Sequence, residues 1–281
     1  MNAVVFGATP SAKALYDEIK INYNIIAYCD NDRKKWGEKM DCVEIISPAD
    51  LMNIQWDEII IISLSAMEVI RKQLLSLGIE ESKINTRYID SKIKARKQFV
   101  VDFAKIAYYK KLEGCVAEAG VFQGEFASVI NENFPDRKLY LFDTFAGFDE
   151  RDIKYEETNK FSDAEQGHLN ITSPETVLNR MSHRDQCVIR AGYFPETVKG
   201  IKEVFLYVNL DMDLYKPTLE GLRFFYPLMV QGGIITVHDF FSAGYEGVNA
   251  AVWEFIAERK EVIVPFPIGD HISIAIQKGK L

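Results

Sequence analysis

The sequence predicts an α/β protein built from two parallel sheets, with the smaller sheet first in the chain. Short apolar runs alternate with segments of helical periodicity over most of the 281 residues. Some runs are apolar on both faces, as residues 59–62 (four isoleucines) show, which is typical of a parallel sheet covered by helices. In the second half, four runs end at or beside a carboxylate, at Glu118, Asp143, Asp211 and Asp239.

The first part of the chain alternates strand and helix. The apolar runs predict strands at residues 3–6, 25–29, 43–46 and 58–63, and the periodic segments predict helices at residues 11–21 and 66–77. Gly78 is placed to end the second helix. We therefore expect a smaller βαβ domain over residues 1–90. Residues 91–112 also have helical spacing and are expected to form a linker helix.

Strand and helix alternate again in the second domain, expected over residues 113–281. The end of the chain differs, because two apolar runs, at residues 262–268 and 271–276, flank a Gly-Asp turn. This pattern predicts a terminal antiparallel hairpin at the edge of the parallel sheet. Residues 149–173 are polar and weakly patterned, and we expect this long segment to be functional or disordered.

Composition narrows the class of protein. The chain is 48% hydrophobic and 26% charged, which is ordinary for a folded domain, and its net charge of −8 argues against a nucleic-acid or anionic-membrane surface. The four cysteines show no metal-binding spacing and are expected to be reduced. No segment has the length and apolarity of a membrane span, and the first residues resemble no signal peptide. We expect a cytoplasmic protein with no nucleic-acid or membrane partner.

A turn rich in glycine follows the first strand of the second domain. Glu118, Ala119, Gly120 and Gly124 form the pattern E-x-G-x-x-x-G, which differs from the dinucleotide fingerprint. A carboxylate there suits a cationic or neutral ligand better than a pyrophosphate. Asp143, followed by Thr144, ends the next strand, the usual place for an acceptor of ribose hydroxyls. Together these residues fit S-adenosylmethionine; the alternative is a purely structural turn.

A second set of polar residues follows the next two strands. Asp211 and Asp213 come after one buried run, and His238 and Asp239 after the other. Side chains at the ends of neighbouring parallel strands converge, and such ligands suit Mg²⁺ or Mn²⁺. A nearby carboxylate or imidazole, from Asp213 or His238, would take the proton of a substrate hydroxyl. The alternative is that Asp213 and Asp239 only cap a turn and a helix.

Five motifs from about residue 100 onwards resemble the macrocin O-methyltransferase (TylF-type) family of class I S-adenosylmethionine-dependent enzymes. They are the segments 116–124, 141–148, 192–198, 210–218 and 232–239. The resemblance implies that Glu118, Gly120 and Asp143 bind S-adenosylmethionine, that Gly192 and Tyr193 lie near its adenine, that Asp211 and Asp239 bind the metal and that Asp213 is the general base. The family has two adjacent acids where this chain has His238 and Asp239, which makes Mn²⁺ more competitive with Mg²⁺.

The resemblance also implies an activity. Known members methylate hydroxyls of sugars attached to natural products, with Mg²⁺ as a cofactor, so we expect a sugar, nucleotide-sugar or glycoside substrate and a homo-oligomer. Residues 1–90 resemble the Rossmann-like N-terminal domain of bacterial sugar-modifying enzymes, where it can bind a nucleotide-sugar; here a structural role is the alternative. Two other functions stay open: methylation of a different small molecule, on oxygen or nitrogen, and a non-catalytic sugar-nucleotide-binding subunit.

Overall fold

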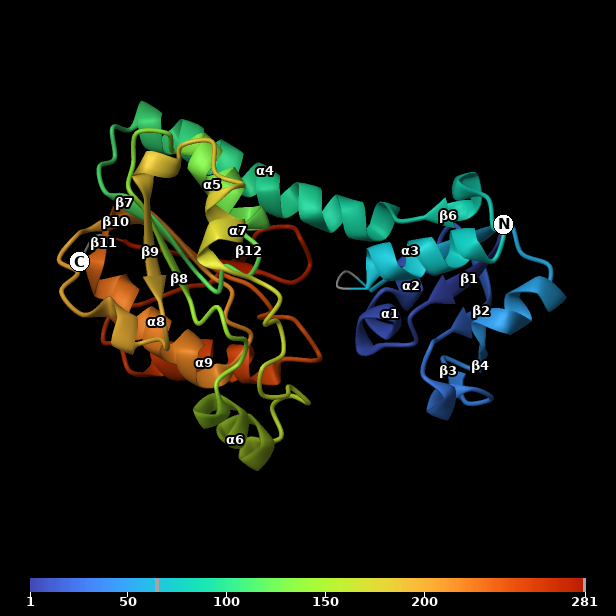
Figure 1. Ribbon diagram of the computed structural model, residues 1–281. Coiled ribbons are helices and arrows are strands. Elements are labelled where there is room, and N and C mark those ends of the chain that lie inside the picture. Colours follow the sequence, from blue (N-terminus) through green and yellow to red (C-terminus); the bar gives the residue numbers. More distant parts are fainter. Residues whose placement is uncertain (64–65, 280–281) are drawn as a thin grey trace. The chain divides into compact units, whose positions relative to one another are not determined.

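The computed structural model describes residues 1–63 and 66–279, and the chain divides into two compact units, Met1–Ile93 and Lys94–Leu281 (Figure 1). Each unit contains a mostly parallel sheet with helices, so the predicted α/β class is confirmed. Helix α4 (Arg87–Tyr109) begins in the first unit and ends in the second. Within the described residues, no helix combines the length and apolarity that crossing a membrane requires.

The first unit is a six-stranded sheet with the order β3-β4-β2-β1-β5-β6. Its strands are β1 (Asn2–Phe6), β2 (Asn24–Cys29), β3 (Lys39–Met40), β4 (Val43–Ile46), β5 (Glu58–Ile61) and β6 (Ile84–Asn85). Its helices are α1 (Pro10–Ala14), α2 (Tyr16–Lys20) and α3 (Met67–Ser76). The single helix predicted over residues 11–21 is thus two short helices separated at Leu15, and strands β3 and β6 were not predicted.

The second unit is a seven-stranded sheet with the order β12-β13-β11-β10-β7-β8-β9. Its strands are β7 (Cys115–Ala119), β8 (Leu139–Asp143), β9 (Cys187–Ala191), β10 (Phe205–Leu210), β11 (Met229–Val237), β12 (Phe266–Pro267) and β13 (Ile274–Gln277). Its helices after α4 are α5 (Glu125–Asn133), α6 (Glu150–Asn159), α7 (Pro174–Leu178), α8 (Tyr215–Leu228) and α9 (Glu246–Ala257).

The central strands β7, β8 and β10 of the second unit are buried on both faces because their side chains alternate between two apolar cores. Ala117 of β7 and Phe142 of β8 face a core that α8 and α9 cover, whereas their neighbours Val116 and Leu141 face a core covered by α4, α5 and α7. Figure 1 shows these two helical layers on opposite sides of the sheet. Burial on both faces explains why the sequence shows continuous apolar runs here.

The end of the chain forms the predicted antiparallel edge, but with shorter strands than predicted. β13 pairs antiparallel with β11 and with β12, which has only two residues. Residues 262–265 lie outside any strand, and the turn residue Asp270 is buried. Its carboxylate accepts hydrogen bonds from the main-chain N–H groups of Ile272 (3.1 Å) and Ser273 (2.7 Å), which delays the start of β13 to Ile274.

The polar segment 149–173 contains regular structure. Helix α6 opens at its N-cap Asp149, whose side chain accepts the N–H of Arg151. The carboxylate of Glu156 is buried and accepts the N–H of Tyr215 at 2.8 Å, which fixes α6 to the start of α8. The segment is therefore held by polar contacts, which a search for apolar periodicity does not detect.

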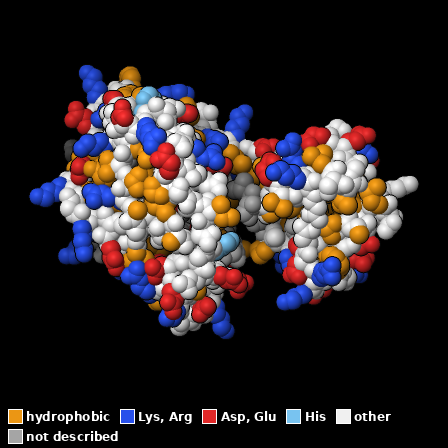
Figure 2. Space-filling view, in the orientation of Figure 1, with side chains coloured by type: hydrophobic (Ala, Val, Ile, Leu, Met, Phe, Trp, Pro, Cys, Tyr) orange, Lys and Arg blue, Asp and Glu red, His pale blue; other side chains and the backbone are white. Residues whose placement is uncertain are grey.

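Charged side chains of both signs are mixed on the surface. On the face drawn in Figure 2, Lys and Arg side chains are interspersed with Asp and Glu on both units. This distribution agrees with the modest net charge of −8. A surface of mixed sign gives a weaker long-range field than a surface of one sign.

The order of the strands reverses between β7 and β10, which are parallel neighbours. Ligands of open α/β sheets bind at such a reversal, outside the carboxyl ends of the strands. Gly120 follows β7 with φ +83°, and a Cβ atom there would lie 1.8 Å from the carbonyl oxygen of Asp211. The glycine is therefore required by the main chain that follows β10.

Replacing Gly120 with alanine should lower the free energy of unfolding by about 3 kcal/mol or more. The left-handed backbone alone costs an alanine about 1–2 kcal/mol, and the overlap with Asp211 adds the cost of moving a main chain. Gly200→Ala is the matched control, since Gly200 has φ +81° and, apart from its chain neighbours, no atom of the described residues lies within 4 Å of the added Cβ. Urea denaturation of both variants measures the difference, and equal losses would contradict the steric argument.

Candidate functional site

The carboxyl ends of the central strands are aligned by main-chain hydrogen bonds that continue beyond the strands. The N–H groups of Gly120, Asp211 and His238 each donate to a carbonyl oxygen of the neighbouring strand, at 2.9, 2.8 and 2.9 Å. The residues that follow β8, β7, β10 and β11 therefore lie in that order along one edge of the sheet. The sequence prediction that these ends converge is consistent with this arrangement.

Asp143 ties together the two turns on the predicted cofactor side. Its Oδ2 atom accepts the N–H groups of Val121 and Phe122, both at 2.8 Å, and its Oδ1 atom accepts the N–H of Phe145 at 2.7 Å. A ligand hydroxyl bound here would share oxygen atoms that are already fixed by the main chain. The main chain thus fixes the orientation of the carboxylate, which lowers the ordering cost for any ligand that would bind there.

The other residues predicted on this side shape the turns. Gly124 has φ +81° at the N-cap of α5, where an added Cβ would lie 3.0 Å from Val177. The hydroxyl of Thr144 donates to the carbonyl of Gly147 at 2.7 Å. Ala119 is fully buried as the last residue of β7. Each of these residues therefore has a structural role that does not depend on a bound ligand.

Glu118 lies within the sheet, one residue before the end of β7, and is only 1% exposed. Its Oε1 atom accepts a hydrogen bond from Nδ2 of Asn209 at 2.8 Å, and its Oε2 atom has no hydrogen-bond partner among the described residues. Burial and the nearby Asp211 raise the pKa of Glu118 well above its usual value. Direct contact between Glu118 and a cofactor stays a prediction.

Gly192 and Tyr193 follow β9, beside the end of β8. The N–H of Gly192 donates to the carbonyl of Asp143 at 2.9 Å. The hydroxyl of Tyr193 donates to Asp152 of α6 at 2.8 Å, and the guanidinium of Arg151 lies 3.5 Å from the centre of its ring. The segment 149–173 therefore reaches the side of the site where the adenine was predicted.

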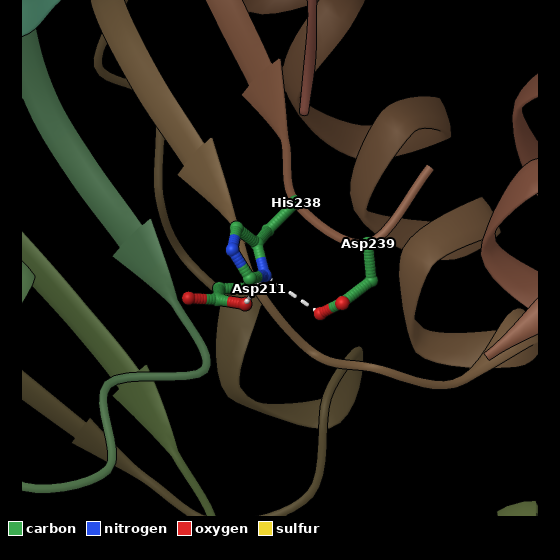
Figure 3. Close-up of side chains that lie close together, drawn as sticks. All are labelled: Asp211, His238 and Asp239. Carbon is green, nitrogen blue, oxygen red and sulfur yellow. Dashed lines mark hydrogen bonds and ion pairs between the residues drawn. The ribbon is translucent and has the colours of Figure 1, made fainter. Parts of the chain in front are cut away.

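Asp211, His238 and Asp239 form a compact cluster on the other side (Figure 3). Nδ1 of His238 lies 3.0 Å from Oδ1 of Asp211 and 2.6 Å from Oδ2 of Asp239. One potential ligand atom from each side chain lies within 4.8 Å of the others. Two carboxylates and one imidazole make a suitable ligand set for Mn²⁺. They suit Mg²⁺ less well, because Mg²⁺ prefers oxygen ligands.

The cluster strongly perturbs the ionisation of its members. Burial alone would raise the pKa of Asp211, but the positive charges of His238 and Arg96 lower it well below its usual range. Burial and Arg96 oppose protonation of His238, but Asp211 and Asp239 outweigh them and raise its pKa to about 10. Strongly perturbed carboxylates and imidazoles in one place are typical of functional sites.

Asp213 completes the cluster from the loop between β10 and α8. It has a left-handed backbone, with φ +62°, as does Asp239, with φ +56°. Burial and the neighbouring charge of Asp239 raise the pKa of Asp213 well above its usual value. Non-glycine residues in this backbone region are uncommon and cluster at functional sites, where the surrounding structure maintains them.

Two residues of this site were missed by sequence reasoning. Arg96 reaches the cluster from α4, and its Nη2 atom lies 2.8 Å from Oδ2 of Asp211 and 3.3 Å from Oδ1 of Asn209. Asn209 is buried in the otherwise apolar strand β10. A buried polar residue within an apolar run was an available signal for Asn209, whereas nothing in the helical pattern of residues 91–112 distinguishes Arg96 from a surface arginine.

Two family models match the chain. The model described as C2185-like, N-terminal, matches residues 1–85, and the model of macrocin-O-methyltransferase (TylF) matches residues 93–277. The chain belongs to the macrocin-O-methyltransferase (TylF) family. It is therefore an S-adenosylmethionine-dependent methyltransferase that transfers a methyl group to oxygen. No curated protein matches the chain significantly.

Solved structures support the fold. The O-methyltransferase NovP is 20% identical, with a TM-score of 0.55 over 66% of this chain and 80% of NovP. The calicheamicin methyltransferase CalS11 is 18% identical, with a TM-score of 0.54 over 77% of this chain and 93% of CalS11. These matches identify a class I methyltransferase fold, as the sequence resemblance implied, preceded by a smaller N-terminal domain.

Asp152 should make stability depend on pH. Burial raises the pKa of this carboxyl from 3.8 to about 6, although the Tyr193 hydrogen bond opposes the shift. The folded protein therefore holds the proton more tightly, so the free energy of unfolding should fall by about 2 kcal/mol as pH rises from 4 to 6. In Asp152→Asn the free energy of unfolding should no longer fall over this pH range, and at pH 7 it should be higher than that of the wild type. Urea denaturation at several pH values measures it, and parallel curves for both proteins would contradict the assignment.

Proposed function

We propose that this enzyme methylates a sugar hydroxyl, in a nucleotide-sugar or a glycoside, and that all residues for methyl transfer lie in the unit Lys94–Leu281. The observation that carries the proposal is the convergence of Asp211, His238 and Asp239 beside the glycine turn after β7. CalS11, which shares the fold, is described as a TDP-rhamnose 3′-O-methyltransferase. A sugar hydroxyl is a weak nucleophile, so its methylation needs positioning and a base.

On the cofactor side, we propose that Asp143 accepts hydrogen bonds from the ribose of S-adenosylmethionine, with Thr144, Gly120 and Gly124 around it and Gly192 and Tyr193 towards the adenine. Support comes from the fixed orientation of the Asp143 carboxylate and from its position at the strand-order reversal. We also propose that Glu118, whose Oε2 atom has no partner among the described residues, contacts the cofactor, whereas Ala119, which is fully buried, supports the strand end.

On the acceptor side, we propose that Asp211, His238 and Asp239 hold Mg²⁺ or Mn²⁺. When bound, such an ion lowers the pKa of a coordinated hydroxyl. We propose Asp213 as the base, because it lies beside Asp239 in the loop after β10 and is not one of the three ligands, whereas Nδ1 of His238 already lies between two carboxylates. His238 orients these carboxylates while it is protonated, and it would contribute a ligand on losing that proton when a cation binds.

Asp143→Ala should weaken S-adenosylmethionine binding by about 1–3 kcal/mol, or roughly 5- to 150-fold, since the ribose hydroxyls would lose an ionised acceptor. Titration calorimetry measures the affinity, and the melting temperature shows whether the turns that Asp143 ties together survive. Glu125→Ala is a suitable control, because it removes an exposed carboxylate at the start of the adjacent helix. An unchanged affinity in a folded Asp143→Ala protein would refute the ribose assignment.

The acceptor class is tested by incubating the enzyme with labelled S-adenosylmethionine and a panel of nucleotide-sugars, glycosides and small phenols. We expect the label in the sugar, and Asp211→Asn should reduce this transfer at least a hundredfold while leaving cofactor affinity nearly unchanged, because the amide keeps the shape but loses the charge. EDTA treatment should mimic the variant, and added Mn²⁺ should restore activity. Full activity after removal of metal would exclude the metal role, and labelling of phenols alone would exclude the sugar.

A further inference from the structure

The guanidinium of Arg96 is held in place from three sides. Its Nη2 atom binds both Oδ2 of Asp211 and Oδ1 of Asn209, and its Cζ atom lies 4.0 Å from the centre of the Phe126 ring. The side chain is only 15% exposed. A planar guanidinium that lies over an aromatic ring is a contact that suits arginine better than lysine.

The partners of Arg96 are themselves fixed. Asn209 donates to Glu118 at 2.8 Å and accepts from the hydroxyl of Thr236 at 2.9 Å, so its Oδ1 atom has a defined position. Both oxygen atoms of Asp211 are occupied, Oδ1 by His238 at 3.0 Å and Oδ2 by Arg96 at 2.8 Å. The orientation of the Asp211 carboxylate is therefore set from both ends.

We propose that Arg96 is a positioning residue that orients Asp211 and weakens divalent-cation binding at Asp211, His238 and Asp239. This inference rests on the proposed function of those three residues as a cation site. Any ion bound to Asp211 shares that carboxylate with a permanent positive charge, and like charges repel strongly where water is largely excluded. Arg96 thereby lets the carboxylate keep its orientation when no ion is bound, at the expense of affinity for the ion.

Binding of Mn²⁺, followed by the electron paramagnetic resonance signal of the free ion, tests the proposal on the full chain. Arg96→Gln should bind Mn²⁺ at least tenfold more tightly than the wild type, whereas Arg96→Lys, which keeps the charge, should stay within about threefold. Arg180→Gln is the control, because Arg180 is a more exposed arginine of the same unit that pairs with Glu125. Equal or weaker Mn²⁺ binding by Arg96→Gln would overturn the proposal, including the case in which neither protein binds the ion.

The melting temperature of Arg96→Gln shows whether a change in Mn²⁺ affinity comes from the lost charge or from loss of structure. Arg96→Gln leaves the buried Asp211 with one cationic partner fewer, so its melting temperature should fall without metal and should rise more than that of the wild type when Mn²⁺ is added. If Arg96→Gln does not fold, Arg96→Met, which keeps an apolar stem against Phe126, replaces it. The double variant Arg96→Gln, Asp211→Asn should bind Mn²⁺ no more tightly than Asp211→Asn alone. Tighter Mn²⁺ binding by the double variant would mean that Arg96 does not act through Asp211.

The same proteins distinguish failure of this inference from failure of the proposed function. If the wild type transfers methyl groups to a sugar but Arg96→Gln leaves the Mn²⁺ affinity unchanged, the role of Arg96 is wrong and the function stands. If no sugar is methylated, the function is wrong, and the ratio of the Mn²⁺ affinities still decides whether Arg96 opposes the cation.

Discussion

The main chain of Asp211 passes so close to Gly120 that a Cβ atom at this position would overlap its carbonyl oxygen. This contact brings the turn after β7 against the loop after β10. Both halves of the site depend on it, because Asp143 binds the N–H groups of that turn while Asp211 begins the acidic cluster. In methyl transfer, donor and acceptor have to meet within a few ångströms and in line. Gly120 thus allows the two proposed binding regions to approach each other at the edge that the strand order gives them.

Electrostatics is the second constraint on this edge. The carboxylates of Asp211, Asp213 and Asp239 lie close together, and acids crowded in this way repel unless positive charge separates them. Here His238 and Arg96 provide it from two different elements, β11 with its following loop and α4. The arrangement differs from a purely acidic cation site, which depends on its ion to reduce the repulsion.

The sequence predicted what depends on local pattern and missed what depends on long-range contact. Apolar runs located the buried strands, and the carboxylates that follow them indicated the edge that carries the site. Arg96 was missed because its partners Asn209 and Asp211 are more than a hundred residues away, with sequence separations of 113 and 115. Helix α6 was missed because its buried face includes the polar Asp152 and Glu156, so it lacks the apolar stripe that identifies a helix from sequence.

The short strand β12 also affects how the molecule meets other chains. It forms one border of the seven-stranded sheet, and Pro267 is one of its two residues. Proline has no N–H to donate, and a two-residue strand offers little backbone for a further strand to pair with. This border is therefore a poor template for β-sheet extension, which protects the protein from edge-to-edge aggregation when it accumulates at high concentration.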